Sequence, residues 1–233
     1  MPDSPGPGSP GPDSPPGPVR PSPLRRWRRL AWGAVAVVAL ALAALGSRQG
    51  SSAAPLVRGG ANVFASALPG TPAPGFTLTD QRGRPQSLAA FRGRVVVLSF
   101  IDSRCTTTCP LTAQMLRTAM AEIGPQAAHV QLLAVNVNRF ASGVSDVRAW
   151  TDQHGMAGRW LFLTGPVPTL RGIWAAYHVA VEGTNAGNIQ HTSALYVIGR
   201  HGRERWLMTS EASAGSIDTE AHALASHVMG VLR

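Results

Sequence analysis

The sequence predicts an α/β fold in which helices flank a mixed sheet, and three observations support this prediction. Residues 95–101 form a short, β-branched apolar run, which is typical of a strand buried on both faces of a parallel sheet. Further strand and helix patterns alternate along the chain, which indicates parallel βαβ units. The last two strand patterns, 192–198 and 203–208, are joined by a short turn and therefore predict an antiparallel hairpin.

Each predicted element has a local signal of its own. Alternating residues at 76–80, a turn at 82–84 and residues 85–88 predict a small hairpin ahead of the main sheet. Pro110 suits a first helical position because its missing N–H needs no partner there, and the helical pattern continues to about Gly124. Ser145 or Asp146 is placed to cap the next helix. The later elements are strand 129–137, a helix from 145, strand 160–164, helix 168–177, polar loop 182–190, strand 192–198, turn 199–202, strand 203–208 and helix 216–232.

The first 70 residues are expected to lie outside the folded domain, which we place at 71–233. Residues 1–29 combine a Pro/Gly-rich tail, which buries too little apolar surface to fold, with a cluster of arginines. Residues 30–46 are apolar and uncharged, and at ~1.5 Å per residue they reach the length of a short transmembrane helix. Residues 47–70, rich in Gly, Ser and Ala, are expected to be a linker.

The arginines before the apolar run set the expected orientation. They predict a single-pass anchor with the N-terminus in the cytoplasm and the domain on the extracytoplasmic side of the cell membrane. A cleaved signal peptide would show similar basic and apolar regions, whereas a buried core helix is disfavoured because no polar face interrupts the run. Both membrane interpretations export the domain.

The charge distribution argues against a nucleic-acid partner. The formal net charge is +9, and all 21 basic residues are arginine. Apart from the N-terminal cluster these arginines are scattered, whereas a nucleic-acid surface gathers basic residues on one face. We therefore predict no nucleic-acid binding.

The two cysteines of the chain, Cys105 and Cys109, follow strand 95–101 at its carboxyl end. In α/β sheets this is where ligands and reactive groups collect, and a helix N-terminus beside Cys109 favours the thiolate. A structural disulfide is one interpretation, although so small a loop gains little from a cross-link. A reactive pair would serve either thiol–disulfide exchange or a soft-metal site that uses a histidine as third donor.

Seven histidines compete for the role of third donor. His191 differs from the others because it stands between a polar loop and a core strand, where the antiparallel strand is expected beside the cysteine loop. The other six are expected to be solvated or structural: His129, His154, His178, His201, His222 and His227.

Three segments, 76–80, 100–112 and 190–199, give this sequence a resemblance to the Sco/SenC family that extends over roughly 73–232. The resemblance implies a thioredoxin-like, membrane-tethered domain that binds one copper ion through Cys105, Cys109 and His191. Family members assist assembly of the copper centre of cytochrome c oxidase, so the implied partners are a copper-accepting oxidase subunit and a thiol reductant protein. The family usually has an acidic residue after the second core strand, whereas the segment 135–139 of this chain has none and carries Asn136 and Asn138.

The function expected from the sequence is therefore that of a membrane-anchored metallochaperone. It delivers copper to the copper site of a respiratory oxidase, or keeps that site reduced. The alternative is an exported thiol–disulfide oxidoreductase with Cys105 and Cys109 as its redox centre. A non-catalytic binding module with a structural disulfide is the third possibility.

Overall fold

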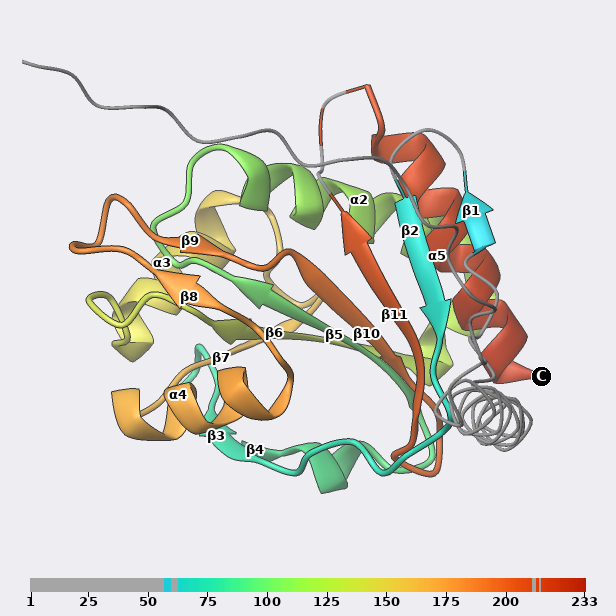
Figure 1. Cartoon of the computed structure of the whole chain (residues 1–233), viewed down its shortest axis with the longest axis horizontal. Helices are drawn as coiled ribbons and strands as arrows, with labels where there is room; N and C mark the ends of the chain where they lie inside the picture. Colours follow the sequence, from blue (N-terminus) through green and yellow to red (C-terminus); the bar gives the residue numbers. More distant parts are fainter. Residues whose placement is uncertain (1–56, 60–62, 211–212, 214) are drawn as a thin grey trace, which may run out of the picture. The chain divides into compact units, whose positions relative to one another are not determined.

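The computed structural model describes residues 57–59, 63–210, 213 and 215–233. Within these residues, seven strands form one sheet in the order β1-β2-β11-β10-β5-β6-β7 (Figure 1). The strands β5, β6 and β7 are parallel, and the other neighbours are antiparallel, so the predicted mixed sheet is confirmed. The strands are β1 Val57–Gly59, β2 Val63–Ala67, β5 Val95–Ile101, β6 Val130–Asn136, β7 Leu161–Leu163, β10 Ala194–Ile198 and β11 Glu204–Ser210.

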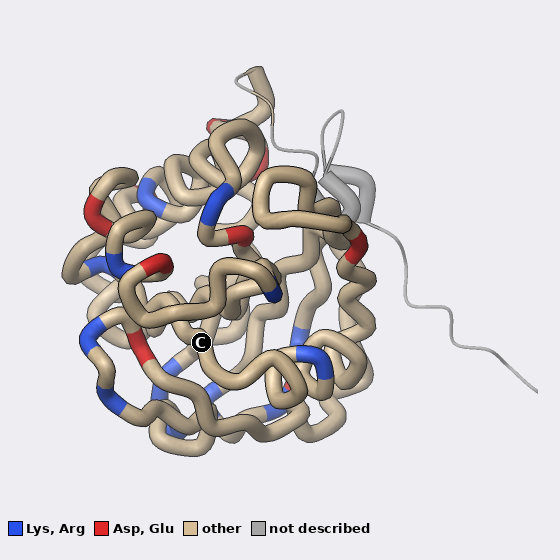
Figure 2. Tube along the Cα trace, turned by 90° about the vertical axis from the view of Figure 1, so that its left-hand side faces the viewer, with Lys and Arg blue, Asp and Glu red and all other residues tan. Residues whose placement is uncertain are grey.

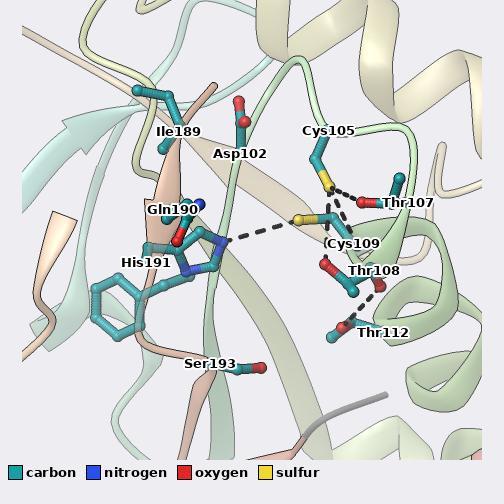
Figure 3. Close-up of a pocket in the computed structure, with 11 residues that line it drawn as sticks. Asp102, Cys105, Thr107, Thr108, Cys109, Thr112, Ile189, Gln190, His191 and Ser193 are labelled. Atoms are coloured by element: carbon teal, nitrogen blue, oxygen red, sulfur yellow. Dashed lines mark hydrogen bonds between the residues drawn. The ribbon is translucent and has the colours of Figure 1, made fainter. Parts of the chain in front are cut away.

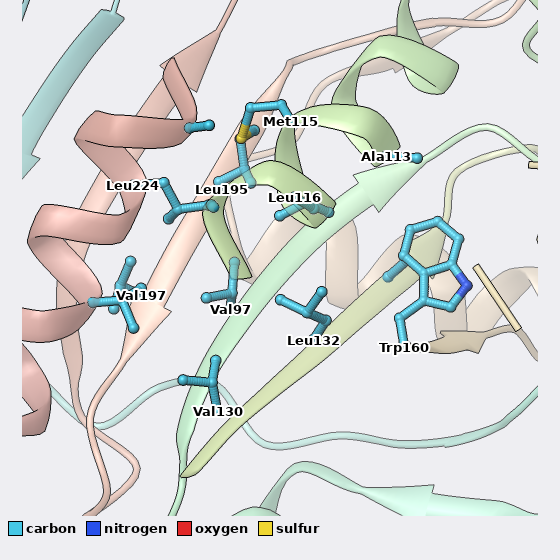
Figure 4. Close-up of a cluster of buried hydrophobic side chains, with 14 of the residues drawn as sticks. Val97, Ala113, Met115, Leu116, Val130, Leu132, Trp160, Leu195, Val197 and Leu224 are labelled. Carbon is cyan, nitrogen blue, oxygen red and sulfur yellow. The ribbon is translucent and has the colours of Figure 1, made fainter. Parts of the chain in front are cut away.

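Strand β5 lies inside the sheet, and all of its residues are buried because its alternating side chains face two hydrophobic clusters. Val97 packs in the cluster that contains residues of α2 (Thr108–Ile123) and α5 (Ile217–Leu232). Leu98 packs in the other cluster, which contains residues of α4 (Val167–Ala176). Figure 4 shows part of the first cluster, where strand side chains meet those of the two helices.

The smaller elements follow the predicted order. The predicted first hairpin is confirmed, and helix α2 begins at Thr108, so Cys109 lies in its first turn. The predicted polar loop 182–190 has a short ladder at its base. These elements are β3 Thr77–Thr79, β4 Pro85–Ser87, the 3-10 helices Leu88–Phe91 and Gly124–His129, α3 Val144–Gln153, β8 Val181–Glu182 and β9 Gln190–His191.

The sheet extends into residues that were expected to be a linker. Strand β2 pairs with β11 from Ala67 to Val63, and β1 pairs with β2. Ala65 is only 2% exposed, so this segment contributes to the core. Pairing with β2 satisfies the backbone groups that β11 would otherwise leave open at the edge of the sheet. Small residues in this segment give it the composition of a linker, which is why the sequence did not indicate a strand.

The expected tail, 1–29, and the expected anchor, 30–46, lie outside the described residues. In the part of the chain that the structure describes, no helix combines the length and the apolar character needed to cross a bilayer. Basic and acidic residues are distributed around the described domain (Figure 2). Arg104 forms an ion pair with Asp146 there, and His222 Nδ1 lies 3.3 Å from Glu122 Oε2.

Candidate metal centre

A cavity of about 380 Å³ lies at the carboxyl end of β5, where the cysteine loop meets the β8–β9 hairpin (Figure 3). Its walls come from the loop after β5, from the first turns of α2 and from residues 189–193. The fold therefore brings Cys109 and His191, 82 positions apart in the sequence, to the same cavity.

The two cysteines are free thiols in different environments. Cys109 is 3% exposed, whereas Cys105 is only partly buried. The backbone N–H of Cys109 donates to the Cys105 sulfur at 3.4 Å, and the hydroxyls of Thr107 and Thr108 lie 3.7 and 3.9 Å from the same sulfur. Cys105 thus has several hydrogen-bond donors within reach of one sulfur atom.

These contacts make the acidity of the two thiols unequal. The hydrogen bond from the Cys109 side chain, helped by backbone N–H groups of Cys109 and Thr107, lowers the pKa of Cys105 to about 4, against the opposing effect of burial. The pKa of Cys109 is raised, first by its hydrogen bond to Cys105 and then by burial. At neutral pH the pair therefore consists of a Cys105 thiolate and a protonated Cys109.

His191 is held in an orientation that suits metal binding. Its Nδ1 is 3.0 Å from the carbonyl oxygen of Thr192, so Nδ1–H donates to that carbonyl. In the neutral ring this hydrogen bond leaves the lone pair on Nε2, which lies 3.9 Å from the Cys109 sulfur (Figure 3). The expected approach of His191 to the cysteine pair is confirmed, whereas ligation of a metal by these residues stays a prediction.

The spacing of these donors can be compared with that of a bound metal. At bond lengths of ~2.3 Å to sulfur and ~2.0 Å to imidazole nitrogen, two ligands of one ion lie ~3.5–3.8 Å apart. The observed 3.9 Å between Cys109 and His191 is close to this spacing. Among the described residues, however, no three His, Cys, Asp or Glu side chains are already gathered as a metal site. The types of donor, two thiols and an imidazole, nevertheless fit a soft metal.

Asp102 is a residue of this cavity that the sequence reasoning did not select. It is 4% exposed, and its Oδ1 accepts hydrogen bonds from the Arg104 N–H at 2.8 Å and from Asn138 Nδ2 at 2.7 Å. Burial raises the pKa of Asp102, and these two hydrogen bonds oppose the change. The sequence did contain a signal, because Asp102 directly follows an apolar strand at its carboxyl end.

A second cavity, of about 280 Å³, is also lined by Cys105. The buried Trp150 of α3 lines it and donates from Nε1 to the carbonyl oxygen of Cys105 at 3.0 Å. The Trp150 ring stacks on His154, with ring centroids 3.9 Å apart. The backbone of Cys105 is therefore fixed by a large aromatic side chain that the sequence reasoning had not linked to the site.

The other six histidines, all within the described ranges, do not line the main cavity. His154 stacks on Trp150, and His227 packs against Trp206 with ring centroids 4.0 Å apart. Burial lowers the pKa of His227. The structure thus separates His191 from the remaining histidines, as expected.

Solved structures show the same fold. ScoI of Arabidopsis thaliana, determined with copper bound, is 16% identical and covers 68% of this chain and 98% of its own, with a TM-score of 0.59. A SCO1/SenC family lipoprotein from Bacillus anthracis is 20% identical and covers 72% and 98%, with a TM-score of 0.61. BsSco, described as a Sco family cytochrome c oxidase assembly protein with a disulfide switch, is 20% identical and covers 70% and 94%, with a TM-score of 0.56. The predicted thioredoxin-like fold is therefore confirmed.

One curated relative has higher identity over a shorter stretch. Peroxiredoxin Q, chloroplastic, of Sedum lineare is 36% identical over 80 residues, which are 34% of this chain and 42% of that protein. The chain thus spans about two fifths of the length of this relative. The similarity concerns only part of both proteins.

A family model covers most of the described domain. The SCO1/SenC model matches residues 67–226, which is more than half of the chain. The matched range contains both cysteines, His191 and the elements that bring them to one cavity. The chain therefore belongs to the SCO1/SenC family.

Proposed function

We propose that this chain is an extracytoplasmic protein that binds one copper ion through Cys105, Cys109 and His191. It delivers copper to the copper site of a respiratory oxidase, or keeps that site reduced. The observation that supports this most is the 3.9 Å approach of His191 Nε2 to the Cys109 sulfur. Two thiolates and a neutral imidazole are soft donors, which favour copper over hard cations. The copper-bound structure of the Arabidopsis relative supports the choice of metal.

The state of the thiols determines what accompanies metal binding. Cys105 is already a thiolate at neutral pH, whereas Cys109, whose pKa is raised, still holds its proton. Because a thiol coordinates as the thiolate, Cys109 loses this proton when the metal binds. Copper uptake should therefore release a proton from Cys109 and weaken as the pH falls.

The location and the partners belong to the same proposal. Residues 30–46 anchor the chain in the cell membrane, with residues 1–29 in the cytoplasm and the domain outside. The partners are a copper-accepting oxidase subunit and a thiol reductant protein, which keeps the cysteine pair reduced in an oxidising compartment. The Bacillus anthracis relative, a lipoprotein, supports attachment to a membrane.

Metal analysis of the reduced, full-length protein under anaerobic conditions tests the proposal. We expect one copper ion per wild-type chain and loss of binding in Cys109→Ser and in His191→Ala. His222→Ala is the matched control, because His222 is exposed and pairs with Glu122 away from the cavity. Reduced wild-type protein that binds no copper would refute the proposed function.

A thiol–disulfide oxidoreductase is the second candidate, and the unequal acidity of the thiols favours it. The Cys105 thiolate would attack one sulfur of a substrate disulfide and expel the other as a thiolate. Cys109 would then lose its proton and attack Cys105 in the mixed disulfide. The substrate gains two electrons, and the chain is left with a Cys105–Cys109 disulfide. Turnover that survives His191→Ala, measured with a dithiol reductant and a disulfide substrate, would favour this function over copper binding.

A further inference from the structure

The short β8–β9 hairpin carries His191, and its own hydrogen bonds lie in its ladder, in its turn and between Ala180 and Thr192. Its ladder has two residue pairs, one of which is Val181↔His191. The turn is closed by Asn188, whose Oδ1 accepts two backbone hydrogen bonds at 2.9 Å each. Side chains outside the hairpin also bond to its turn.

One of these contacts comes from Asn138, a fully buried residue (0% exposed) in the loop after β6. Its Nδ2 donates one hydrogen bond to Asp102 Oδ1 at 2.7 Å and another to the carbonyl oxygen of Ala186 at 2.9 Å. Its Oδ1 accepts the backbone N–H groups of Phe140 and Ala141 at 3.0 and 3.1 Å. The carboxamide thus uses both of its donors and both of its acceptor positions.

We propose that Asn138 is a positioning residue that holds the histidine hairpin against the cysteine loop by donating one hydrogen bond to each. On one side, Asp102 belongs to the cysteine loop, since its carbonyl oxygen accepts the Cys105 N–H at 3.1 Å. On the other side, Ala186 lies in the turn of the hairpin that ends at His191. One side chain therefore connects the two segments that supply the proposed ligands. The effect of Asn138 on copper affinity rests on the proposed function, whereas its effect on the hairpin does not.

The two acceptor oxygens that face the side chain of residue 138 suit an amide there better than a carboxylate. A carboxylate at 138 would have no hydrogen to donate, and it would face the Asp102 oxygen that now lies 2.7 Å away. It would also face the carbonyl oxygen of Ala186. Asp102 stands at the end of the neighbouring strand β5, and Asn138 provides the complementary donors.

Arg139 makes a second link of the same kind. Its guanidinium donates to the carbonyl oxygen of Gly183, at the start of the hairpin turn. Two successive residues of one loop thus hold two points of the hairpin. Arg139 is partly exposed, so water replaces its hydrogen bond more readily than that of the buried Asn138.

Variants of the full chain separate this link from the simple pairing of residues 102 and 138. Asn138→Asp keeps the size of the side chain but removes both donors. The double variant Asp102→Asn/Asn138→Asp restores an amide–carboxylate pair between the two positions, yet it still leaves the Ala186 carbonyl without its donor. Asn188→Asp is the matched control, because it makes the same change of charge in the exposed hairpin turn and keeps the acceptor oxygens. The amide donor that it loses faces the Thr184 hydroxyl, which can donate to the new carboxylate instead.

Two measurements are made on each variant. They are amide hydrogen exchange of residues 181–191 and Cu(I) affinity by competition with a chromophoric chelator. We expect the single Asn138 variant and the double variant to exchange faster and to lose ~10–100-fold in copper affinity, the usual effect of removing a group that orients a metal ligand. Asn188→Asp should retain wild-type copper affinity. Recovery of wild-type exchange and affinity in the double variant would overturn the proposal, because the bond to Ala186 would then be dispensable.

The test also covers two other cases: a variant that does not fold, and a wild-type chain that binds no copper. If Asn138→Asp does not fold, the double variant and Arg139→Gln decide, and Arg139→Gln should raise exchange of the hairpin by a smaller factor. Wild-type exchange in both of these variants would overturn the proposal. A wild-type chain that binds no copper would refute the proposed function alone, since hydrogen exchange would still decide the role of Asn138.

Discussion

The acidity of Cys105 depends most on its hydrogen bond with Cys109, which leads to a sharp prediction. This bond is the largest of the effects that lower the pKa of Cys105 from 9.0 to about 4. Cys109→Ala removes the side-chain donor, whereas Cys109→Ser keeps an O–H at nearly the same place. A hydrogen bond to a charged group is worth ~1.5–3 kcal/mol, which corresponds to ~1–2 pKa units. We expect the pKa of Cys105 to rise by about this amount in the alanine variant and to stay low in the serine variant.

The low pKa of Cys105 changes its alkylation rate less than it changes the pH at which alkylation begins. With a pKa of about 4, Cys105 is ~99% thiolate at pH 6, compared with ~0.1% for a thiol at the reference value of 9.0. The nucleophilicity of a thiolate falls with its pKa with a slope of ~0.4–0.5, so five units cost ~2–2.5 decades of intrinsic reactivity. The alkylation rate at pH 6 should therefore be only ~3–10-fold above that of an ordinary thiol. The midpoint of the pH profile is the more informative quantity.

The assay is the pH profile of iodoacetamide alkylation of the reduced protein, with the modified peptide identified by mass spectrometry. Cys109 should remain unmodified in the wild type, because it is buried and its pKa is raised. Wild type and Cys109→Ser should show a plateau above about pH 6, and the midpoint in Cys109→Ala should be higher. A wild-type midpoint near the ordinary value of a thiol, or equal midpoints in the two variants, would refute the reasoning.

Three further predictions concern stability. The pKa of Cys105 is lower in the folded than in the unfolded chain, so the thiolate stabilises the fold fully above the unfolded pKa. This stabilisation is lost as the pH falls towards about 4. The urea midpoint of the reduced wild type should therefore fall more between pH 8 and pH 5 than that of Cys105→Ser. Trp150→Phe removes the hydrogen bond to the Cys105 carbonyl and should lower the free energy of unfolding by ~1–3 kcal/mol, measured by urea denaturation. Leu133→Ala, at a fully buried position of β6, should cost ~2–5 kcal/mol in the same assay, and a loss below ~1 kcal/mol would contradict the packing described for this strand.

Residues 95–101 show why the centre of the sheet was predictable. A strand covered on both faces must be apolar at every position, and this leaves a pattern that local sequence alone reveals. Strand β2 shows the opposite case. Residues 63–67 have no strong strand pattern of their own. They pair with β11 because its edge of the sheet would otherwise be open. The need to cover this edge arises only in the assembled sheet, so the local sequence of residues 63–67 does not indicate a strand.

The site was predictable to a similar extent. The positions of Cys105 and Cys109 after a core strand indicated a reactive pair. His191 was selected as the third ligand, over the other histidines, mainly through the resemblance to a family. The partnership of Asp102 with Asn138 could not be derived, because it depends on the register of two parallel strands. Ile101 pairs with Asn136, so both loops leave the sheet at the same level and their polar side chains meet.

The three proposed ligands are held with unequal firmness, and this difference predicts which one adjusts to the metal. Cys109 lies in the first turn of α2, a helix packed in the main core, whereas His191 lies in a short hairpin whose turn is largely exposed. Exposed segments with little buried apolar surface open first, so the hairpin is the part that should move when copper enters or leaves. Copper binding should therefore slow amide exchange in 181–191 much more than in 108–123. If the helix gained as much protection as the hairpin, ordering of the whole domain would be the better explanation, and the histidine would not be the adjustable donor.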